Sequence, residues 1–233
     1  MKSLHVISGG AAQGLVAQLS EGFAAQHGCS IDGTFGAVGL MKDKLLAGAP
    51  CDVVILTAAL IAELERQGHA VAGSARPLGV VRTGVAVKSG EPAPAVDTPE
   101  ALAAVLRGAQ GIYFPDPVKA TAGIHFMKVM QTLGLDQELA SQLRPFPNGA
   151  TAMREMAAAP GSQLVGCTQV TEILYTPGVQ LVGVLPSAFE LATVYTAAVC
   201  GRAADPAAAQ ALVQLLAADV SKPLRLAGGF EER

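Results

Sequence analysis

The sequence predicts an α/β protein of two lobes, in which mixed, mostly parallel sheets are flanked by helices and a ligand cleft lies between the lobes. Two observations lead to this prediction. Apolar runs of strand length alternate with runs of helix length, as in parallel sheets covered by helices. Several apolar runs also end in turns of small residues that open directly into a helix. The 233 residues, 51% of them hydrophobic, are enough for the cores of two small lobes.

Strands and helices alternate regularly in the N-terminal part of the chain. The expected order is strand 4–8, helix 13–27, strand 30–35, helix 39–47, strand 52–56 and helix 58–67. Leu15, Leu19 and Phe23 lie on one face of the first helix, which is the pattern of an amphipathic helix. Strand 52–56 is a continuous apolar run, as expected for a buried parallel strand.

The rest of the chain repeats the alternation less regularly. The expected order is strand 80–88, helix 99–106, strand 111–114, helices 124–133 and 149–156, strand 163–167, helix 168–174, strands 179–185 and 191–200, and helix 206–220. Thr98-Pro99 and Asp205-Pro206 are typical helix starts, with an N-cap residue followed by proline at the first helical position.

Two stretches are suited to carry the chain from one lobe to the other. They lie near residues 80–84 and 186–191. We therefore expect residues 1–80 and 190–233 to form lobe one, and residues 81–189 to form lobe two. Ligands of open α/β sheets bind beyond the carboxyl ends of the strands, so the cleft is expected at those ends.

Three turns of small residues precede helices and are suited to hold an anion. They are Thr121-Ala122-Gly123, Ser8-Gly9-Gly10-Ala11-Ala12 and the segment 34–39. Such turns present backbone N–H groups at the positive end of a helix dipole. No single turn is specific, but the three together predict a cleft that recognises a small anion with main-chain donors.

Composition argues against several other classes of protein. A net charge of −3 with scattered basic residues predicts no nucleic-acid binding, and no apolar run is long enough for membrane insertion. The absence of a leader before the first strand predicts a cytoplasmic chain as given, or a periplasmic one if a signal peptide was trimmed. The four cysteines form no CxxC pair, which predicts neither a metal site nor a disulfide framework. The Gly-rich segment 8–14 is not a clean GxGxxG, so no cofactor is expected.

The sequence resembles the type II periplasmic binding protein fold and, within it, the molybdate-binding protein family. The resemblance covers nearly the whole chain. It is carried by residues 6–15, by Gly48-Ala49-Pro50-Cys51-Asp52 with the strand that follows, by Asp116-Pro117 with Ala122-Gly123, and by Gly228-Gly229-Phe230. It implies a two-lobed fold in which the end of the strand after Asp52 helps to line the cleft, and the segment from Asp116 to Gly123 forms an anion-facing turn in the second lobe. It implies an ABC permease partner only if a leader was removed.

The departures from this family favour an organic acid over a metal oxyanion. Serines and a tyrosine hold the ligand in molybdate binders, whereas Ala11, Ala37 or Val38, and Gly166-Cys167 occupy the matching positions here. Arg82, beside Thr83 at the first crossover, is suited to bind a carboxylate through two hydrogen bonds. We therefore expect an organic di- or tricarboxylate, with molybdate or tungstate as the less favoured ligand.

The candidate ligand-binding residues follow from these turns and strand ends. They are Ser8, Gly9, Gly10, Ala37, Val38, Thr57, Arg82, Thr83, Lys119, Thr121, Gly123, Asn148 and Thr168. Several of them have an ordinary structural alternative: Thr57 and Thr121 as helix caps, and the glycines where a turn or a close contact needs a small residue. Asn148 and Gly149 are expected to form a further pair of donors at a helix start.

Two functions from different classes remain open. The first is a binding protein that holds the anion without turnover. The second is a cofactor-free isomerase of a small carboxylate, as in the aconitate-isomerase-like branch of the same fold, which needs a base to remove a proton next to a carboxylate. His125, Cys167 and Glu172 are rival candidates for that base, and the position of Cys167 at an expected helix start predicts a lowered thiol pKa.

Overall fold

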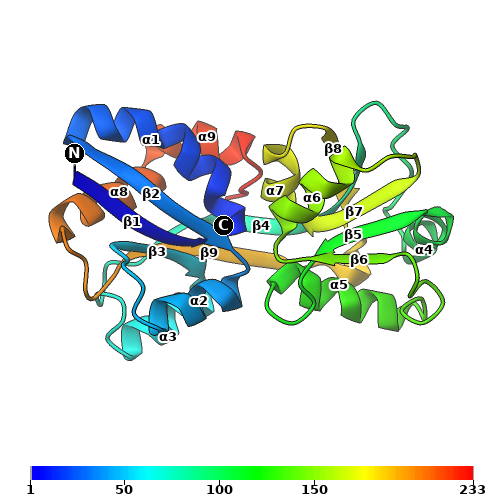
Figure 1. The fold of residues 1–233 in the computed structure, drawn as a ribbon, viewed down its shortest axis with the longest axis horizontal. Coiled ribbons are helices and arrows are strands. Elements are labelled where there is room, and N and C mark those ends of the chain that lie inside the picture. Colours follow the sequence, from blue (N-terminus) through cyan, green and yellow to red (C-terminus); the bar gives the residue numbers. More distant parts are fainter. Residues whose placement is uncertain (1, 233) are drawn as a thin grey trace. The chain divides into compact units, whose positions relative to one another are not determined.

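The computed structural model describes residues 2–232 and divides the chain into two compact units (Figure 1). Unit 1 contains the residues up to Val81 and those from Thr193 onward, and unit 2 contains Arg82–Ala192. The chain passes between the units twice. The first passage lies within strand β4 (Arg76–Lys88), and the second lies at the start of strand β9 (Ala192–Val199).

Unit 1 is a sheet covered by helices on both faces. Its strands are β1 (Lys2–Gly9), β2 (Cys29–Gly36), β3 (Val53–Thr57), β9 and the first part of β4. Its helices are the 3₁₀ turn η1 (Gly10–Ala12), α1 (Gln13–His27), α2 (Val38–Leu46), α3 (Ala58–Arg66), α8 (Pro206–Ala217), the 3₁₀ turn η3 (Asp219–Ser221) and α9 (Lys222–Ala227). The sheet order begins β2-β1-β3-β9, with β9 antiparallel to β3. Helices α1, α8 and α9 cover one face, and α2 and α3 cover the other (Figure 1).

The register of the parallel strands brings their carboxyl ends to one edge of unit 1. β1 pairs with β2 from Lys2↔Cys29 to Gly9↔Gly36, and Ser8 of β1 pairs with Ile55 of β3. The chain therefore leaves all three parallel strands at the same edge and enters a helix each time. We call this edge, with the helix starts that follow it, the unit 1 strand-end edge.

A buried carboxylate fixes the opposite end of the same sheet. Asp52 is 2% exposed and accepts the backbone N–H of His5 at 2.8 Å and that of Ala204 at 2.7 Å. Because both acceptor oxygens are used, the buried charge has hydrogen-bond partners. Asp52 thereby links the loop before β3 to β1 and to the segment after β9.

Unit 2 is a second sheet with separate apolar cores on its two faces. Its strands are the second part of β4, β5 (Gly111–Pro115), β6 (Leu143–Phe146), β7 (Leu164–Gln169) and β8 (Val179–Val184). Its helices are α4 (Pro99–Gly108), α5 (Thr121–Thr132), α6 (Gly149–Ala158), α7 (Val170–Tyr175) and the 3₁₀ turn η2 (Ser187–Phe189). β5 is parallel to β6 and β7, and β4 is antiparallel to β7 and β8.

The two cores of unit 2 are built by different helices. One contains Leu102 of α4 and Phe126 of α5, and the other contains Met153 of α6 and Ile173 of α7. Each fully buried side chain of this size contributes roughly 1.5–3 kcal/mol relative to exposure. Helices α5 and α6 therefore lie on opposite faces of the sheet (Figure 1).

The expected α/β class and nearly all expected elements are confirmed, and the differences have local causes. β6 was not expected, because its sequence Leu-Arg-Pro-Phe contains a proline, which is tolerated only at the edge of a sheet. The last helix was expected to extend to residue 220, but α8 ends at Ala217 and α9 begins at Lys222. Helix α5 begins at Thr121, three residues before the expected start at Ile124.

Gly123 supplies a test of how α5 packs against the loop that precedes it. A Cβ at this position would lie 2.2 Å from the carbonyl oxygen of Pro115 and 2.3 Å from that of Asp116. We predict that Gly123→Ala lowers the free energy of unfolding of unit 2 by about 1–3 kcal/mol, the typical cost of overpacking. Denaturant unfolding followed by circular dichroism measures this change.

The control for that substitution is Gly22→Ala. Gly22 is also a helical glycine, in α1, but a Cβ there would meet nothing within 4 Å. Alanine should stabilise this exposed position by about 0.5–1 kcal/mol. Equal effects of the two substitutions would contradict the close approach of α5 to its preceding loop.

Candidate functional site

The unit 1 strand-end edge brings together six of the predicted ligand-binding residues. Ser8, Gly9 and Gly10 leave β1 there, and Ala37 and Val38 start α2 after β2. A Cβ on Gly9 would lie 2.8 Å from Cγ1 of Val38, so the two turns are in contact. The same edge also holds Thr57, at the end of β3, bringing the predicted residues there to six.

Tyr195 of β9 belongs to the same edge and was missed by the sequence analysis. It is cross-strand neighbour to Thr57, is 2% exposed, and its Cε1 lies 3.1 Å from the position of a Cβ on Gly9. A tyrosine within a strand pattern is an ordinary core residue. Only the antiparallel pairing of β9 with β3 places it beside the turns.

Helix starts in this protein fall into two groups. The side chains of Thr57, Thr98, Asn148 and Asp205 cap α3, α4, α6 and α8 by accepting a backbone N–H of the first turn. No side chain caps η1, α1, α2 or α5, and the same holds for α7, α9, η2 and η3. The first four of these uncapped starts belong to the three turns that the sequence singled out. The first N–H groups of a helix have no partner within the helix, so an uncapped start offers donors to an anion or to water.

The hydroxyls at the unit 1 strand-end edge are already engaged. Thr57 Oγ1 accepts the backbone N–H of Leu60 at 3.4 Å, and Ser8 Oγ donates to the carbonyl oxygen of Gly9 at 2.8 Å. Ser8 is fully buried. The exchangeable donors that this edge offers are therefore mainly backbone N–H groups.

In unit 2 the uncapped start of α5 follows a tight turn. The carboxylate of Asp116 accepts the backbone N–H of Val118 at 2.6 Å and that of Lys119 at 2.9 Å. Thr121 is the first residue of α5 and Ala120 occupies the cap position, so Thr121 does not act as the helix cap. Lys119 is exposed in the turn, and Gly123 is buried against the carbonyls of this turn.

Thr83 and Gln169 form a buried polar pair without hydrogen-bond partners for their side chains. They are cross-strand neighbours on β4 and β7, and are 1% and 3% exposed. Thr83 Oγ1 and both polar atoms of the Gln169 amide lack a hydrogen-bond partner. Leaving such a group unpaired costs about 1–3 kcal/mol, so the pair is a candidate contact for a bound molecule, as is the nearby Thr171 hydroxyl, which also has no partner. Thr83 was predicted as a ligand-binding residue, whereas Gln169 was not.

The start of α6 is occupied by a carboxylate of the chain itself. Glu172, 5% exposed, accepts a hydrogen bond of 2.6 Å from the hydroxyl of Thr168 and further ones from the backbone N–H groups of Gly149, Ala150 and Gln169. Burial raises the pKa of Glu172, and these hydrogen bonds oppose the rise. The expectation that the turn at Asn148 offers donors to a ligand is therefore corrected. Asn148 Oδ1 caps α6 through the N–H of Thr151 at 2.8 Å, and the Gly149 donor serves Glu172.

Arg82 and His125, two further candidates, also have partners within unit 2. Arg82 forms an ion pair with Glu190 at 2.6 Å, and both side chains are about one-third or more exposed, at 34% and 40%. His125 Nε2 lies 2.8 Å from the carbonyl oxygen of Phe189. This contact orients the imidazole and leaves Nδ1 as the ring atom for any further interaction.

The expected activation of Cys167 is wrong. Cys167 lies inside β7, and helix α7 begins only at Val170, so no helix dipole acts on the thiol. The residue is fully buried, and burial raises its thiol pKa. Such a cysteine is a small core residue rather than a nucleophile or base.

Two searches of residues 2–232 gave no candidates. No group of three or more His, Cys, Asp and Glu residues in this range is arranged to hold a metal ion. No helix in this range is long and apolar enough to span a bilayer.

The buried Glu172 predicts a distinct pH dependence of stability. Its pKa is raised above the ordinary value of 4.5, so the unfolded chain loses this proton at lower pH than the folded one. The contribution of Glu172 to the free energy of unfolding therefore falls as pH rises from about 4.5 through the folded pKa. We predict that Glu172→Gln removes this component of the slope. Glu172→Ala, which leaves the donors without an acceptor, should cost about 1–3 kcal/mol.

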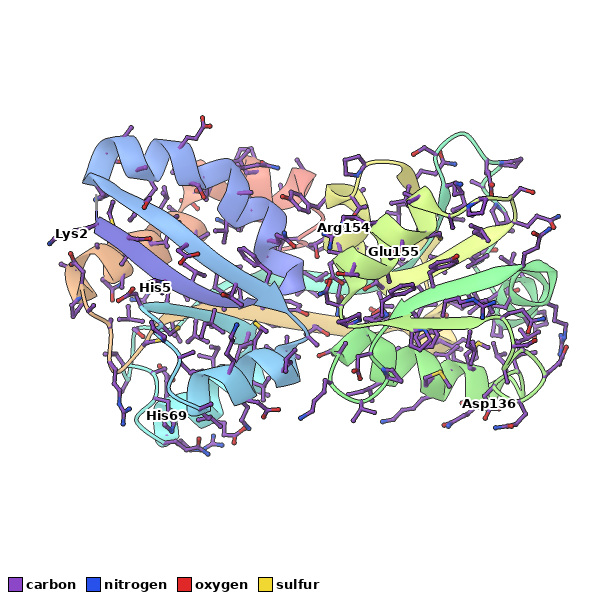
Figure 2. All side chains as sticks on the ribbon, in the orientation of Figure 1. Lys2, His5, His69, Asp136, Arg154 and Glu155 are labelled. Atoms are coloured by element: carbon purple, nitrogen blue, oxygen red, sulfur yellow. The ribbon has the colours of Figure 1, made fainter. Side chains whose placement is uncertain are left out.

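Denaturant unfolding between acidic and neutral pH measures both effects. Glu155→Gln is the control, because Glu155 lies on the exposed side of α6, the helix whose first N–H groups the Glu172 carboxylate accepts, beside Arg154 (Figure 2). That substitution removes a carboxylate without touching the Glu172 network. An identical pH profile for wild type and Glu172→Gln would contradict the raised pKa.

Several known proteins are similar to this chain in sequence or in fold. The curated aconitate isomerase of a Pseudomonas species is 25% identical over 97% of this chain and 87% of its own length. The periplasmic molybdate-binding protein of Azotobacter vinelandii superposes with a TM-score of 0.80 at 20% identity, over 99% of each chain. PEB3 of Campylobacter jejuni with bound L-phospholactate gives a TM-score of 0.70 at 12% identity, over 99% of this chain and 100% of the other.

These solved structures confirm the expected type II periplasmic binding protein fold. The family model described as "Bacterial extracellular solute-binding protein" matches residues 4–231, which is nearly the whole chain. The chain therefore belongs to the family of bacterial extracellular solute-binding proteins.

Proposed function

We propose that this protein binds a small organic di- or tricarboxylate as its solute. The observation that carries the proposal is the group of uncapped helix starts at η1–α1, α2 and α5, each of which follows the carboxyl end of a parallel strand. The backbone N–H groups there would bind carboxylate oxygens, helped by the helix dipoles. The expected cleft between the lobes stays a prediction.

The Thr83–Gln169 pair favours an organic acid over a metal oxyanion. The amide of Gln169 has both a donor and an acceptor without a partner, and the hydroxyl of Thr83 can act as either. A fully ionised tetrahedral oxyanion only accepts hydrogen bonds, so it would leave the Gln169 oxygen unpaired. A carboxylic acid that also carries a hydroxyl or a protonated carboxyl satisfies both atoms.

Arg82 would bind a ligand carboxylate in place of the carboxylate of Glu190. Its guanidinium already pairs with Glu190, and both groups are partly exposed. Exposed pairs of this kind contribute only about 0–1 kcal/mol, so a ligand carboxylate would replace Glu190 at little cost. The ligand would then gain a charge-assisted hydrogen bond.

The ligands named for similar proteins support a small anion as the ligand, but they do not identify which anion this chain binds. Molybdate and L-phospholactate, named for the two solved structures, are both anions, and the second is an organic acid. Transport is the role that the family name supports, with an ABC permease as the partner to which the loaded protein would deliver its solute. Periplasmic location is part of the same proposal.

The first test is binding of a panel of anions to the full chain. Calorimetry and thermal shift should show binding of a tricarboxylate that carries a hydroxyl, such as citrate, and weaker or no binding of molybdate, tungstate and sulfate. Thr83→Val and Gln169→Leu should each weaken tricarboxylate binding about 10- to 100-fold, since a hydrogen bond to a charged group contributes about 1.5–3 kcal/mol.

The stability of the ligand-free variants separates a binding role from a structural one. Replacing an unpaired buried polar group by an apolar one is neutral or stabilising, so the melting temperature without ligand should stay or rise in both variants. Glu155→Gln, on the exposed side of α6, is the control for affinity (Figure 2). Stabilisation by molybdate or tungstate alone would contradict the proposal.

A second candidate function is isomerisation of the bound carboxylate without a cofactor. The observation that favours it is the 25% identity to aconitate isomerase over almost the whole chain. Of the three rival bases, Cys167 is sealed in the core and Glu172 is held by four hydrogen bonds. His125 is the partly exposed one, and its contact with Phe189 would hold the ring in place for proton transfer at Nδ1.

Incubation with aconitate in deuterated water distinguishes the two functions. An isomerase would incorporate deuterium and shift the double bond, as read by NMR, and His125→Asn should lower that rate at least 100-fold. Binding of His125→Asn to aconitate should stay within a few fold of wild type. Binding without any exchange in the wild-type protein would rule out the isomerase.

A further inference from the structure

Two of the four cysteines lie side by side in unit 1, although 149 positions separate them. Cys51 precedes β3 and Cys200 follows β9, and these strands pair antiparallel with Val53 opposite Val199. The pairing places the two Sγ atoms 2.8 Å apart. Both residues are buried, at 8% and 3% exposed.

The backbone around both thiols is held in place. The N–H of Cys200 donates to the carbonyl oxygen of Asp52 at 2.9 Å, and the buried Asp52 carboxylate binds His5 and Ala204 as described above. Cys200 also forms an isolated bridge with Ala70. The backbone hydrogen bonds on both sides therefore hold the two sulfur atoms close together, and no loop has to move to bring them into contact.

A pocket gives small reagents a path to the pair. It has a volume of about 240 Å³, and both cysteines line it together with His69, Pro50 and Arg202. His69 lies in the loop that follows α3 (Figure 2). Neither Cys29 nor Cys167 lines this pocket, and Cys167 is fully buried in unit 2.

We propose that Cys51 and Cys200 form a reversible dithiol–disulfide site, oxidised by exchange with a small disulfide such as oxidised glutathione. The thiolate of Cys51 attacks the reagent, forms a mixed disulfide and releases one reduced thiol. Cys200 reacts second, because its hydrogen bond with Cys51 and its burial raise its thiol pKa. The second thiolate then attacks the protein sulfur of that mixed disulfide, which forms the Cys51–Cys200 bond and releases the second thiol. Two protons leave the protein thiols, and the two electrons reduce the reagent.

The oxidised form would tie the entrance of β3 to the exit of β9. A bond that closes so long a loop constrains the unfolded chain strongly. Extracellular compartments, from which the family takes its name, support such bonds, whereas the cytosol keeps thiols reduced. The site thus makes the stability of unit 1 depend on the compartment.

The test compares the full chain after dithiothreitol with the chain after oxidised glutathione. Intact mass should show the loss of two hydrogen atoms, and non-reducing peptide mapping should find a peptide joining Cys51 to Cys200. The oxidised protein should melt roughly 5–15 °C higher, and dithiothreitol should reverse the shift.

The controls are one double variant that removes the two cysteines outside the site and two single variants that each remove one cysteine of the site. Cys29→Ser/Cys167→Ala keeps the pair and should still show both the mass change and the shift, whereas Cys51→Ser and Cys200→Ser should show neither. If Cys51→Ser fails to fold, the peptide map of the wild-type protein still decides. Two stable glutathione adducts without a cross-link, or four free thiols per chain instead of two after denaturation of the oxidised sample, would overturn the proposal.

Discussion

The register between β1 and β2 is the constraint on which the candidate site of unit 1 depends. Because Gly9 lies opposite Gly36, both strands stop at the same level, and each chain turns into a helix there. Glycine at position 9 lets the turn approach Val38 and Tyr195, where a side chain would collide. A shift of one residue in this register would separate the two helix starts and reverse the faces of the strand.

Capped and uncapped helix starts differ in whether a side chain of the protein accepts the first backbone N–H groups. Unit 2 shows how the fold holds a carboxylate: Glu172 lies at the start of α6 and receives main-chain and hydroxyl donors. The uncapped starts of α1, α2 and α5 are the same kind of end without such an internal acceptor. Mostly small residues lie at these starts, and the proposed function assigns their backbone N–H groups to a solute.

Local patterns were enough to predict most of the fold and part of the site. The three turns, the caps at Thr98 and Asp205 and nearly every helix follow from periodicity and from glycine, proline and capping residues close in sequence. Tyr195, Gln169 and the Cys51–Cys200 contact depend on which strands become neighbours, and that is not visible locally. The activation of Cys167 was wrong because the end of a strand was placed too early, which turned a buried strand residue into an expected helix start.

The Glu172 network also ties separate parts of unit 2 into one cooperative block. Its donors come from the start of α6 and the end of β7, and its acceptor comes from α7. None of the three can be ordered alone without leaving a buried charge or unpaired N–H groups. The amide protons of Gly149 and Ala150 should therefore exchange with solvent only when the whole block opens, as slowly as those of the central strands.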